Sequence, residues 1–282
     1  MTSPTITTSH ISLTTRKGLT GQVHVREAQT AGVAAAPIVF FHGTVGLFDN
    51  EPLLDALSTN HSVYAPVWPS FGEEEGEEAL QDMLDFALHG ADVITELAIR
   101  YKWTTAPIVV GHDMGAMIGA EMACLSPTSM QHLVLLSPLG LWDDAHPIPD
   151  MFIMLPFEWP EWLFVDQALG TELLTRGLDF EDPSAIERFQ VRNARQLGMA
   201  GKVLFPIPNR RLSKRLYRCT TPTTIVWGAQ DKLTPPDPYR TRWGQALPHS
   251  TSATIEGTGH MVHLEKPAEV ADHLLRILGA IT

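Results

Sequence analysis

The chain has 282 residues, which is long enough to bury a full hydrophobic core as one large domain or as a domain with an insertion. Its composition, 44% hydrophobic and 18% charged, is that of a globular protein. The formal net charge of −12 argues against binding to nucleic acids or to anionic membranes, because their phosphates attract an excess of Lys and Arg.

Apolar runs bounded by turn residues recur along the chain and predict five buried strands. They span residues 36–43, 61–68, 106–113, 131–138 and 222–231. Apolar residues at helical spacing predict helices at 78–101, 116–125 and 268–278. Because continuous apolar strands alternate with helices, we expect an α/β protein with a mostly parallel sheet covered by helices on both faces.

The alternation of strands and helices is interrupted between residues 143 and 212. This stretch is mostly helical in pattern and is punctuated by prolines. Open parallel sheets bind their ligands beyond the C-terminal ends of the strands, and we expect the insertion to lie over that edge. The chain then divides into a first part of the core at 1–142, the helical insertion at 143–212 and a second part of the core at 213–282.

The segment Gly111-His112-Asp113-Met114-Gly115 lies between a predicted strand and a predicted helix. A nucleophile at the apex of a sharp, strained turn needs small residues two positions before and two positions after it, so that strand and helix pack closely. The spacing therefore predicts a nucleophile at Asp113. The helix N-terminus beneath it offers backbone N–H groups to developing negative charge.

Two candidate partners follow Asp113 in the chain. Asp231 comes just after a predicted strand, and His260 lies further on, so that nucleophile, acid and histidine appear in the order expected for this turn type. His42 ends another predicted strand and is a candidate substrate contact. The backbone N–H groups of Thr44 and Met114 are the candidate oxyanion donors.

Four motifs carry a resemblance to a known family: FFHGTVG, VGHDMGA, VWGAQDKLTP and GTGHMVHLEKP. They resemble the motifs of the α/β-hydrolase superfamily, over nearly the whole chain. The resemblance implies an eight-stranded, mostly parallel sheet and a cap at about residues 143–212. It also implies the roles of nucleophile, acid and histidine for Asp113, Asp231 and His260. With an aspartate in place of the usual serine, the motif resembles that of the epoxide hydrolases and dehalogenases, the branch that uses an aspartate nucleophile.

An aspartate nucleophile suits an electrophilic saturated carbon. A carboxylate that displaces a leaving group from such a carbon makes an alkyl ester, and His260, oriented by Asp231, then deprotonates a water that attacks this ester. The triad supplies nucleophile and base, so no metal and no organic cofactor is implied. We therefore predict an epoxide hydrolase-like enzyme whose partners are a small hydrophobic substrate and water.

The group that handles the leaving atom separates the possible reactions. Dehalogenases of this family usually carry a halide-binding Trp or a substrate-binding Arg right after the nucleophile, where this chain has Met114, and this favours an epoxide. Epoxide hydrolases typically use two cap tyrosines, but no tyrosine lies within 143–212. Tyr217 is then the candidate phenol, and Trp159 and Trp162 are candidate N–H donors. A haloalkane-type dehalogenase, an esterase-like hydrolase and a non-catalytic binding protein stay open as alternatives.

Other charged residues receive simpler interpretations. Asp143, Asp144 and Asp237 are minor alternatives for the acid of the triad. The arginines at 188, 192 and 195 recur at helical spacing, and we expect them to form a solvated face of the cap.

The remaining features concern the setting of the protein. The two cysteines provide no disulfide framework and no metal-site spacing. No apolar run approaches the roughly 18 residues of a membrane span, and the N-terminal residues lack the pattern of a secretory signal. We expect a cytoplasmic protein, and a homodimer is one possible assembly.

Overall fold

One sheet of eight strands organises the molecule. The structure is a computed structural model and describes residues 6–28, 35–72 and 76–279. The strand order is β1-β2-β4-β3-β5-β6-β7-β8. The strands are β1 Ile6–Thr14, β2 Thr20–Ala28, β3 Ile38–Phe41, β4 Val63–Pro66, β5 Ile108–His112, β6 His132–Leu136, β7 Thr223–Gly228 and β8 Thr251–Ile255. From β4 to β8 all neighbouring strands are parallel, whereas β2 is antiparallel to β1 and to β4.

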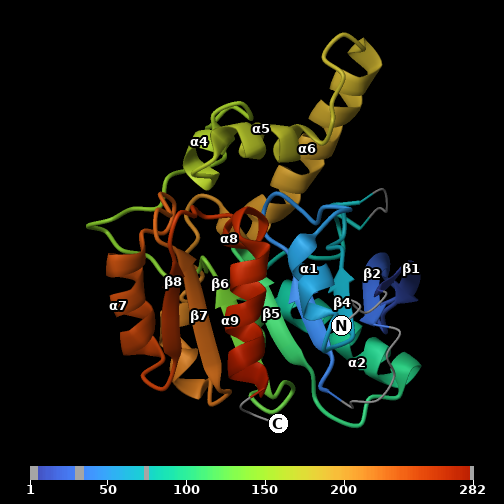
Figure 1. The fold of residues 1–282 in the computed structure, drawn as a ribbon, viewed down its shortest axis with the longest axis vertical. Helices are drawn as coiled ribbons and strands as arrows, with labels where there is room; N and C mark the ends of the chain where they lie inside the picture. Colours follow the sequence, from blue (N-terminus) through green and yellow to red (C-terminus); the bar gives the residue numbers. More distant parts are fainter. Residues whose placement is uncertain (1–5, 29–34, 73–75, 280–282) are drawn as a thin grey trace, which may run out of the picture.

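Helices cover both faces of this sheet, as the sequence predicts (Figure 1). The α-helices of the described residues are α1 Pro52–Leu57, α2 Met83–Tyr101, α3 Met114–Leu125, α4 Trp159–Leu163, α5 Gln167–Thr175, α6 Pro183–Leu204, α7 Pro236–Ala246, α8 Val262–Glu265 and α9 Pro267–Gly279. Helix α2 begins five residues later than position 78, because the Asp82 side chain caps it by accepting the N–H groups of Leu84 and Asp85.

The central strands bury both of their faces, and this explains their continuous apolar sequences. In β3, Ile38 and Phe40 belong to a core layer that contains residues of α1 and α9, while Val39 and Phe41 belong to a second layer with residues of α2 and α3. Successive side chains of a strand point to opposite faces, so each face receives every second residue. The eight-stranded, mostly parallel sheet implied by the sequence is confirmed.

Three helices, α4, α5 and α6, lie between β6 and β7 in the chain and above one edge of the sheet (Figure 1). The C-terminal half of α6 is attached to the core. Arg195 forms an ion pair with Glu77 at 2.8 Å, and Gln196 donates a hydrogen bond to the carbonyl oxygen of Phe71 at 3.1 Å. The N-terminal half of α6 projects away from the sheet (Figure 1). Within the described ranges, no helix has the length and hydropathy needed to cross a bilayer.

Candidate active site

Asp113 lies at the turn between β5 and α3, with φ 54° and ψ −116°. A residue other than glycine rarely adopts a positive φ, so Asp113 is held in a strained backbone conformation of the kind found at functional sites. The two flanking glycines make the turn possible. A Cβ on Gly111 would lie 2.5 Å from the carbonyl oxygen of Gly115, and a Cβ on Gly115 would collide with the carbonyl oxygen of Phe41.

The carboxylate of Asp113 is buried, with 3% of the residue exposed, and one of its oxygens is held by the neighbouring loop. Oδ2 accepts a hydrogen bond from the backbone N–H of Thr44 at 2.7 Å. Gly43 allows this approach, because a Cβ there would lie 2.7 Å from the Cβ of Asp113. Met114 is the first residue of α3, where backbone N–H groups lack partners within the helix.

Asp231 lies in the turn after β7, where its carboxylate is fixed on both oxygens. Oδ1 accepts the backbone N–H groups of Leu233 and Thr234, each at 2.9 Å. Oδ2 accepts the hydroxyl of Thr234 at 2.8 Å and the Nδ1–H of His260 at 2.9 Å. Burial alone raises the pKa of Asp231, but the charge of His260 and these hydrogen bonds outweigh it and lower the pKa.

His260 connects the two carboxylates. Its Nε2 lies 3.8 Å from Oδ1 of Asp113, which is longer than a hydrogen bond. Both of these atoms are buried without a hydrogen-bond partner, so they face each other across a narrow gap. Burial lowers the pKa of His260, yet the negative charges of Asp231 and Asp113 outweigh burial and raise it. The charges of the two carboxylates therefore stabilise the protonated form of the imidazole.

Three further histidines pack around the site without entering it. The ring of His42 accepts the backbone N–H of Trp68 at its Nε2, at 3.0 Å, and donates from its Nδ1 to the carbonyl oxygen of Gly43, at 2.9 Å. Both ring nitrogens are thereby occupied, and burial lowers the pKa of His42 to about 3. His42 supports the loop that holds Thr44, and its contact with a substrate stays a prediction.

The rings of His112 and His263 are in contact, with their centroids 4.2 Å apart and their planes tilted by 47°. His112 donates from Nε2 to the carbonyl oxygen of His260 at 3.0 Å, and burial is the largest cause that lowers its pKa, to about 4. Because His112 fixes the main chain of His260, it positions the residue that faces Asp113. The GHD motif contains this histidine, but nothing in the sequence alone indicates its partner.

Two cavities lie near the site. A small one of about 30 Å³ is lined by Thr44, Leu139 and Leu233 among others, and Leu139 donates its N–H to the carbonyl oxygen of Asp113 at 3.3 Å. A larger one of about 360 Å³ lies under α4, α5 and α6 and is mostly apolar. Neither lining includes Asp113 or His260, but Thr44 and its neighbour Val45 each line one of the two cavities.

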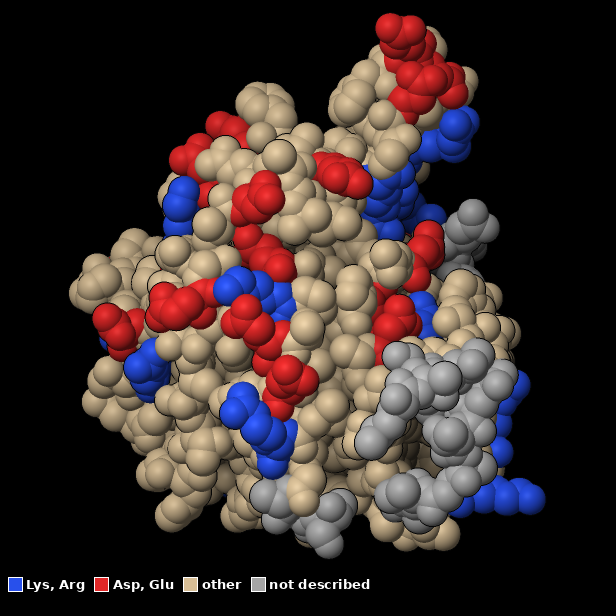
Figure 2. Space-filling view, viewed as in Figure 1, with Lys and Arg blue, Asp and Glu red and all other residues tan. Residues whose placement is uncertain are grey.

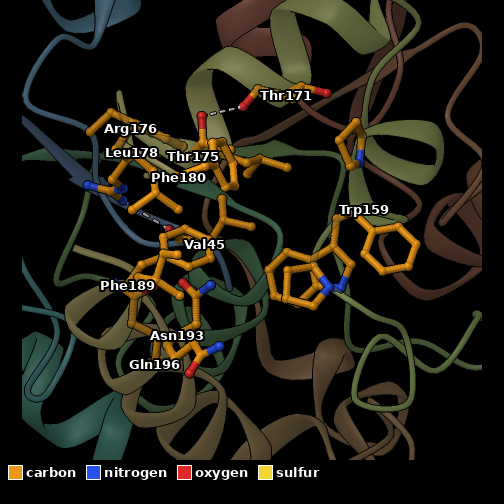
Figure 3. A pocket seen from close by; sticks show the side chains of 17 residues that line it. Val45, Trp159, Thr171, Thr175, Arg176, Leu178, Phe180, Phe189, Asn193 and Gln196 are labelled. Atoms are coloured by element: carbon orange, nitrogen blue, oxygen red, sulfur yellow. Dashed lines mark hydrogen bonds between the residues drawn. The ribbon is translucent and has the colours of Figure 1, made fainter. Parts of the chain in front are cut away.

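The aromatic residues predicted for the site lie in different environments. Trp159 is buried, lines the larger cavity and faces Val45 and Phe189 across it (Figure 3). Its indole Nε1 has no hydrogen-bond acceptor. Trp162 is half-buried and lines neither of the two cavities. Tyr217 is 79% exposed, and a role of its phenol in the site stays a prediction.

The alternative acids are engaged elsewhere or lie apart from His260. Asp143 forms an ion pair with Arg242 at 2.6 Å and accepts from His146 at 3.0 Å. Asp144 accepts the indole N–H of Trp142 at 2.9 Å. Asp237 belongs to the first turn of α7. Among the residues that the structure describes, no group of three or more His, Cys, Asp or Glu side chains is arranged to hold a metal ion.

The comparisons with known proteins agree with this architecture. The sequence pattern of the alpha/beta hydrolase family matches residues 38–273. A provisionally named esterase/lipase of Haemophilus influenzae is 24% identical over 276 residues, which cover 96% of this chain and 92% of that protein. The dihydrolipoyllysine-residue acetyltransferase component of the acetoin cleaving system of Cupriavidus necator is 25% identical over 265 residues, covering 91% of this chain and 67% of that protein.

The fold also matches solved structures. The 2-hydroxy-6-oxo-6-phenylhexa-2,4-dienoate hydrolase of Rhodococcus sp. strain RHA1 superposes with a TM-score of 0.72 at 18% identity, covering 96% of this chain and 99% of that chain. The family pattern spans most of the sequence, and Asp113, Asp231 and His260 follow strands β5, β7 and β8 of the sheet. The chain therefore belongs to the alpha/beta hydrolase family and has the α/β-hydrolase fold.

Proposed function

We propose that this protein is a hydrolase whose nucleophile is the carboxylate of Asp113, acting on a saturated carbon of a hydrophobic small molecule, with an epoxide as the first candidate substrate. The observation that carries the proposal is the unequal environment of the two carboxylate oxygens. Oδ2 is fixed by the N–H of Thr44, whereas Oδ1 has no hydrogen-bond partner and faces His260. A free oxygen next to a fixed one is the arrangement that an attacking carboxylate needs.

In the first step, Oδ1 attacks an epoxide carbon. A bond forms between Oδ1 and that carbon, and the bond between the carbon and the ring oxygen breaks. The ring oxygen leaves with the electron pair as an alkoxide that stays attached to the alkyl group. The charge of the carboxylate thus moves to the alkoxide, while the N–H of Thr44 stays on Oδ2, which is now the carbonyl oxygen of the ester.

The second step follows from the loss of charge at Asp113. Two carboxylates raise the pKa of His260, and esterification neutralises one of them. The pKa of His260 therefore falls, and the imidazole releases its proton more readily. That proton balances the alkoxide and gives the alcohol. Neutral His260 then takes a proton from a water, whose oxygen attacks the ester carbonyl carbon, and the N–H groups of Thr44 and Met114 stabilise the charge on Oδ2. The bond between this carbon and Oδ1 then breaks, and Oδ1 leaves in the diol with the proton from His260. The water oxygen stays in the carboxyl group of Asp113, whose proton returns to His260.

The larger cavity supports a hydrophobic substrate, because apolar side chains such as those of Val45, Phe48 and Leu174 line it. The unpaired indole N–H of Trp159 is the donor in this cavity best suited to a leaving oxygen. The same donor also suits a halide, which leaves as a stable anion and needs no proton. An organohalide is therefore the second leaving group to test within this reaction class.

Ester hydrolysis is a second candidate function, because a relative that matches 96% of this chain is provisionally named an esterase/lipase. An ester substrate needs an oxyanion donor for its own acyl oxygen. In this protein the N–H of Thr44 is already bound to the nucleophile's carboxylate. We place ester hydrolysis second because the acyl oxygen must first displace Oδ2 from that donor.

One substrate panel tests the proposal. Purified protein is given a terminal epoxide, a bromoalkane and a nitrophenyl ester, and the formation of diol, bromide and nitrophenol is measured. Diol formation supports an epoxide as the substrate. Bromide release without diol formation indicates an organohalide substrate instead. Nitrophenol release alone supports ester hydrolysis. A single turnover in heavy-oxygen water, followed by peptide mass analysis, tests the nucleophile. Label in the Asp113 peptide is expected, and its absence would exclude the ester intermediate.

A trapping experiment provides the matched control. The variant His260→Gln keeps Asp113 and its Thr44 contact but lacks the base for the second step. We expect an adduct of substrate mass on the intact protein, and no adduct on a double variant that also carries Asp113→Asn. An adduct on both proteins would place the covalent bond on another residue.

A further inference from the structure

A further hollow lies between α6 and the core, beside the apolar cavity of about 360 Å³ that is called the larger cavity above. Its volume is about 560 Å³, and four arginines line it: Arg176, Arg188, Arg192 and Arg195. In the space-filling view, Lys and Arg side chains gather along the lower part of α6, on the side next to the core (Figure 2). These arginines do not form the uniformly solvated face expected from the sequence, because Arg192 and Arg195 are half-buried against the core.

Two of the four arginines have acidic partners. Arg188 pairs with Asp182 at 3.6 Å, and Arg195 pairs with Glu77 at 2.8 Å. Among the residues that the structure describes, neither Arg176 nor Arg192 has a carboxylate oxygen within 4.0 Å. The two unpaired cations thus share one hollow.

The guanidinium of Arg176 is held in place by uncharged contacts. It lies 4.4 Å from the centroid of the Phe48 ring, and its Nη2 donates to the carbonyl oxygen of Val45 at 3.2 Å (Figure 3). The guanidinium of Arg192 lies 5.4 Å from the centroid of the Phe189 ring, and its Nε is buried without an acceptor. Several N–H donors of both side chains are therefore unused, and a guanidinium offers five.

The charges of the described residues compensate these two cations only in part. Burial is the main cause that lowers the pKa of Arg176, to about 10, and the charge of Arg192 lowers it further. The charge of Glu51 acts in the opposite direction on Arg176, but burial raises the pKa of Glu51 to about 8, so this carboxyl is mostly uncharged at neutral pH. Asp49 acts on both arginines, yet it is exposed to water, which screens its charge. Partly buried charges without a partner are unfavourable and favour binding of an anion.

We propose that Arg176 and Arg192 bind the oxyanion group, a carboxylate or a phosphate monoester, of an amphipathic small molecule whose apolar chain lies in the larger cavity. Arg176 lines both the hollow and that cavity, so one molecule can place its charged end on the arginines and its chain among the apolar side chains. Guanidinium groups bind both oxyanions through paired hydrogen bonds. This inference concerns binding alone and does not depend on the reaction at Asp113.

The proposed binding of an oxyanion is tested by measuring the affinity of the protein for three probes of equal chain length: octanoate, octyl phosphate and octanol. Calorimetry of the full chain is expected to show at least about tenfold tighter binding of one of the anions than of octanol, as charge-assisted hydrogen bonds provide. The comparison of octanoate with octyl phosphate tells which oxyanion fits. Equal affinity for all three probes would overturn the proposal.

Variants assign the affinity to the two arginines. Arg176→Gln and Arg192→Gln should each lower the affinity for the bound anion towards that of octanol, whereas Arg188→Gln, whose guanidinium is paired and exposed, should not. Since Arg176 also packs on Phe48, the variant Arg176→Lys keeps a cation there and should retain part of the affinity. Unchanged anion affinity in Arg192→Gln, with an unchanged melting temperature, would overturn the proposal.

The chain's own acidic segment is the competing occupant. Glu73, Glu74 and Glu75 directly follow Gly72, which lines the hollow. A variant with glutamine at these three positions is expected to bind the preferred anion at most a few-fold more tightly than the wild type. If the wild type binds no anion and only this variant does, the arginines serve the acidic segment and the proposal fails.

Discussion

The backbone N–H of Thr44 donates to Oδ2 of Asp113 at 2.7 Å, so the side chain at the turn already uses the donor that an acyl substrate needs. A serine in the same place has no second oxygen to offer and leaves that donor free. In the proposed mechanism, an aspartate instead of a serine at this turn therefore changes two elements of the site together, the nucleophile and the availability of the oxyanion donor.

The variant Asp113→Ser separates these two elements. We expect turnover of an epoxide or organohalide to fall by about 10³-fold or more, because the attacking carboxylate is lost. We also expect hydrolysis of a nitrophenyl ester to rise, because the N–H of Thr44 is freed for the acyl oxygen. Both rates are measured on the same preparation, and Asp113→Ala serves as the control without a nucleophile. Ester hydrolysis that is equal in the serine and alanine variants would contradict the argument.

Asp231→Asn tests the electrostatic support of His260. Asparagine can still accept the N–H groups of Leu233 and Thr234, so the turn should fold normally. Its neutral side chain no longer raises the pKa of His260, and we expect the rate to fall by about 10³- to 10⁴-fold with the basic limb of the pH–rate profile displaced to lower pH. Asp237→Asn, at a carboxylate outside the site, is the control. An unshifted profile would assign Asp231 a purely structural role.

The buried carboxyl of Glu51 predicts a pH dependence of stability. Its pKa is raised from the usual 4.5 to about 8 in the folded protein, mainly by burial. The folded state therefore holds this proton more tightly than the unfolded state does. Its contribution to the free energy of unfolding is present below the unfolded pKa and is lost as the pH rises towards the folded pKa.

We expect the free energy of unfolding of the wild type to fall between pH 5 and pH 8.5 by more than that of Glu51→Gln, with a difference on the order of a few kcal/mol. Urea unfolding at both pH values measures it. Glu187→Gln, at an exposed position in α6, should follow the wild type. If Glu51→Gln loses as much stability as the wild type, the group responsible lies elsewhere.

Gly115→Ala tests the close packing of α3 on β3. The added Cβ collides with the carbonyl oxygen of Phe41, which belongs to the sheet and cannot move aside easily. We expect a loss of about 2–4 kcal/mol in the free energy of unfolding, or failure to fold. Gly244→Ala, in an exposed helix position with open space around it, should stabilise by up to about 1 kcal/mol. Thermal melts of both variants decide whether the close approach at Gly115 is obligatory.

The buried part of the fold was predictable because its sequence patterns, apolar runs and glycine spacing, each depend on one simple physical cause. The central strands are continuously apolar, and the turn glycines at 111 and 115 have a steric reason that depends on spacing alone. The sequence did not predict β1, β2 and β8. Thr, Ser and His recur in β1, which is mostly exposed, and β8 is half exposed at the other edge of the sheet, so neither shows a long apolar run.

The site was predictable in its triad positions but not in its surroundings. Asp113, Asp231 and His260 come together because each follows a strand at the same edge of a parallel sheet. The direction of a side chain in an irregular segment has no such rule. Tyr217 points to solvent for this reason, and the partners of His42 lie in a loop whose course the sequence does not specify.

The hydrogen bond from Arg176 to the carbonyl oxygen of Val45 joins the end of α5 to the residue directly after Thr44. A displacement of α5 is expected to pull on that peptide and to shift the N–H that holds Asp113. Lifting of the cap to admit a substrate would therefore loosen the donor needed for hydrolysis, and its return would restore it. The proposed alkyl ester of Asp113 would then be hydrolysed only after α5 has returned to its position.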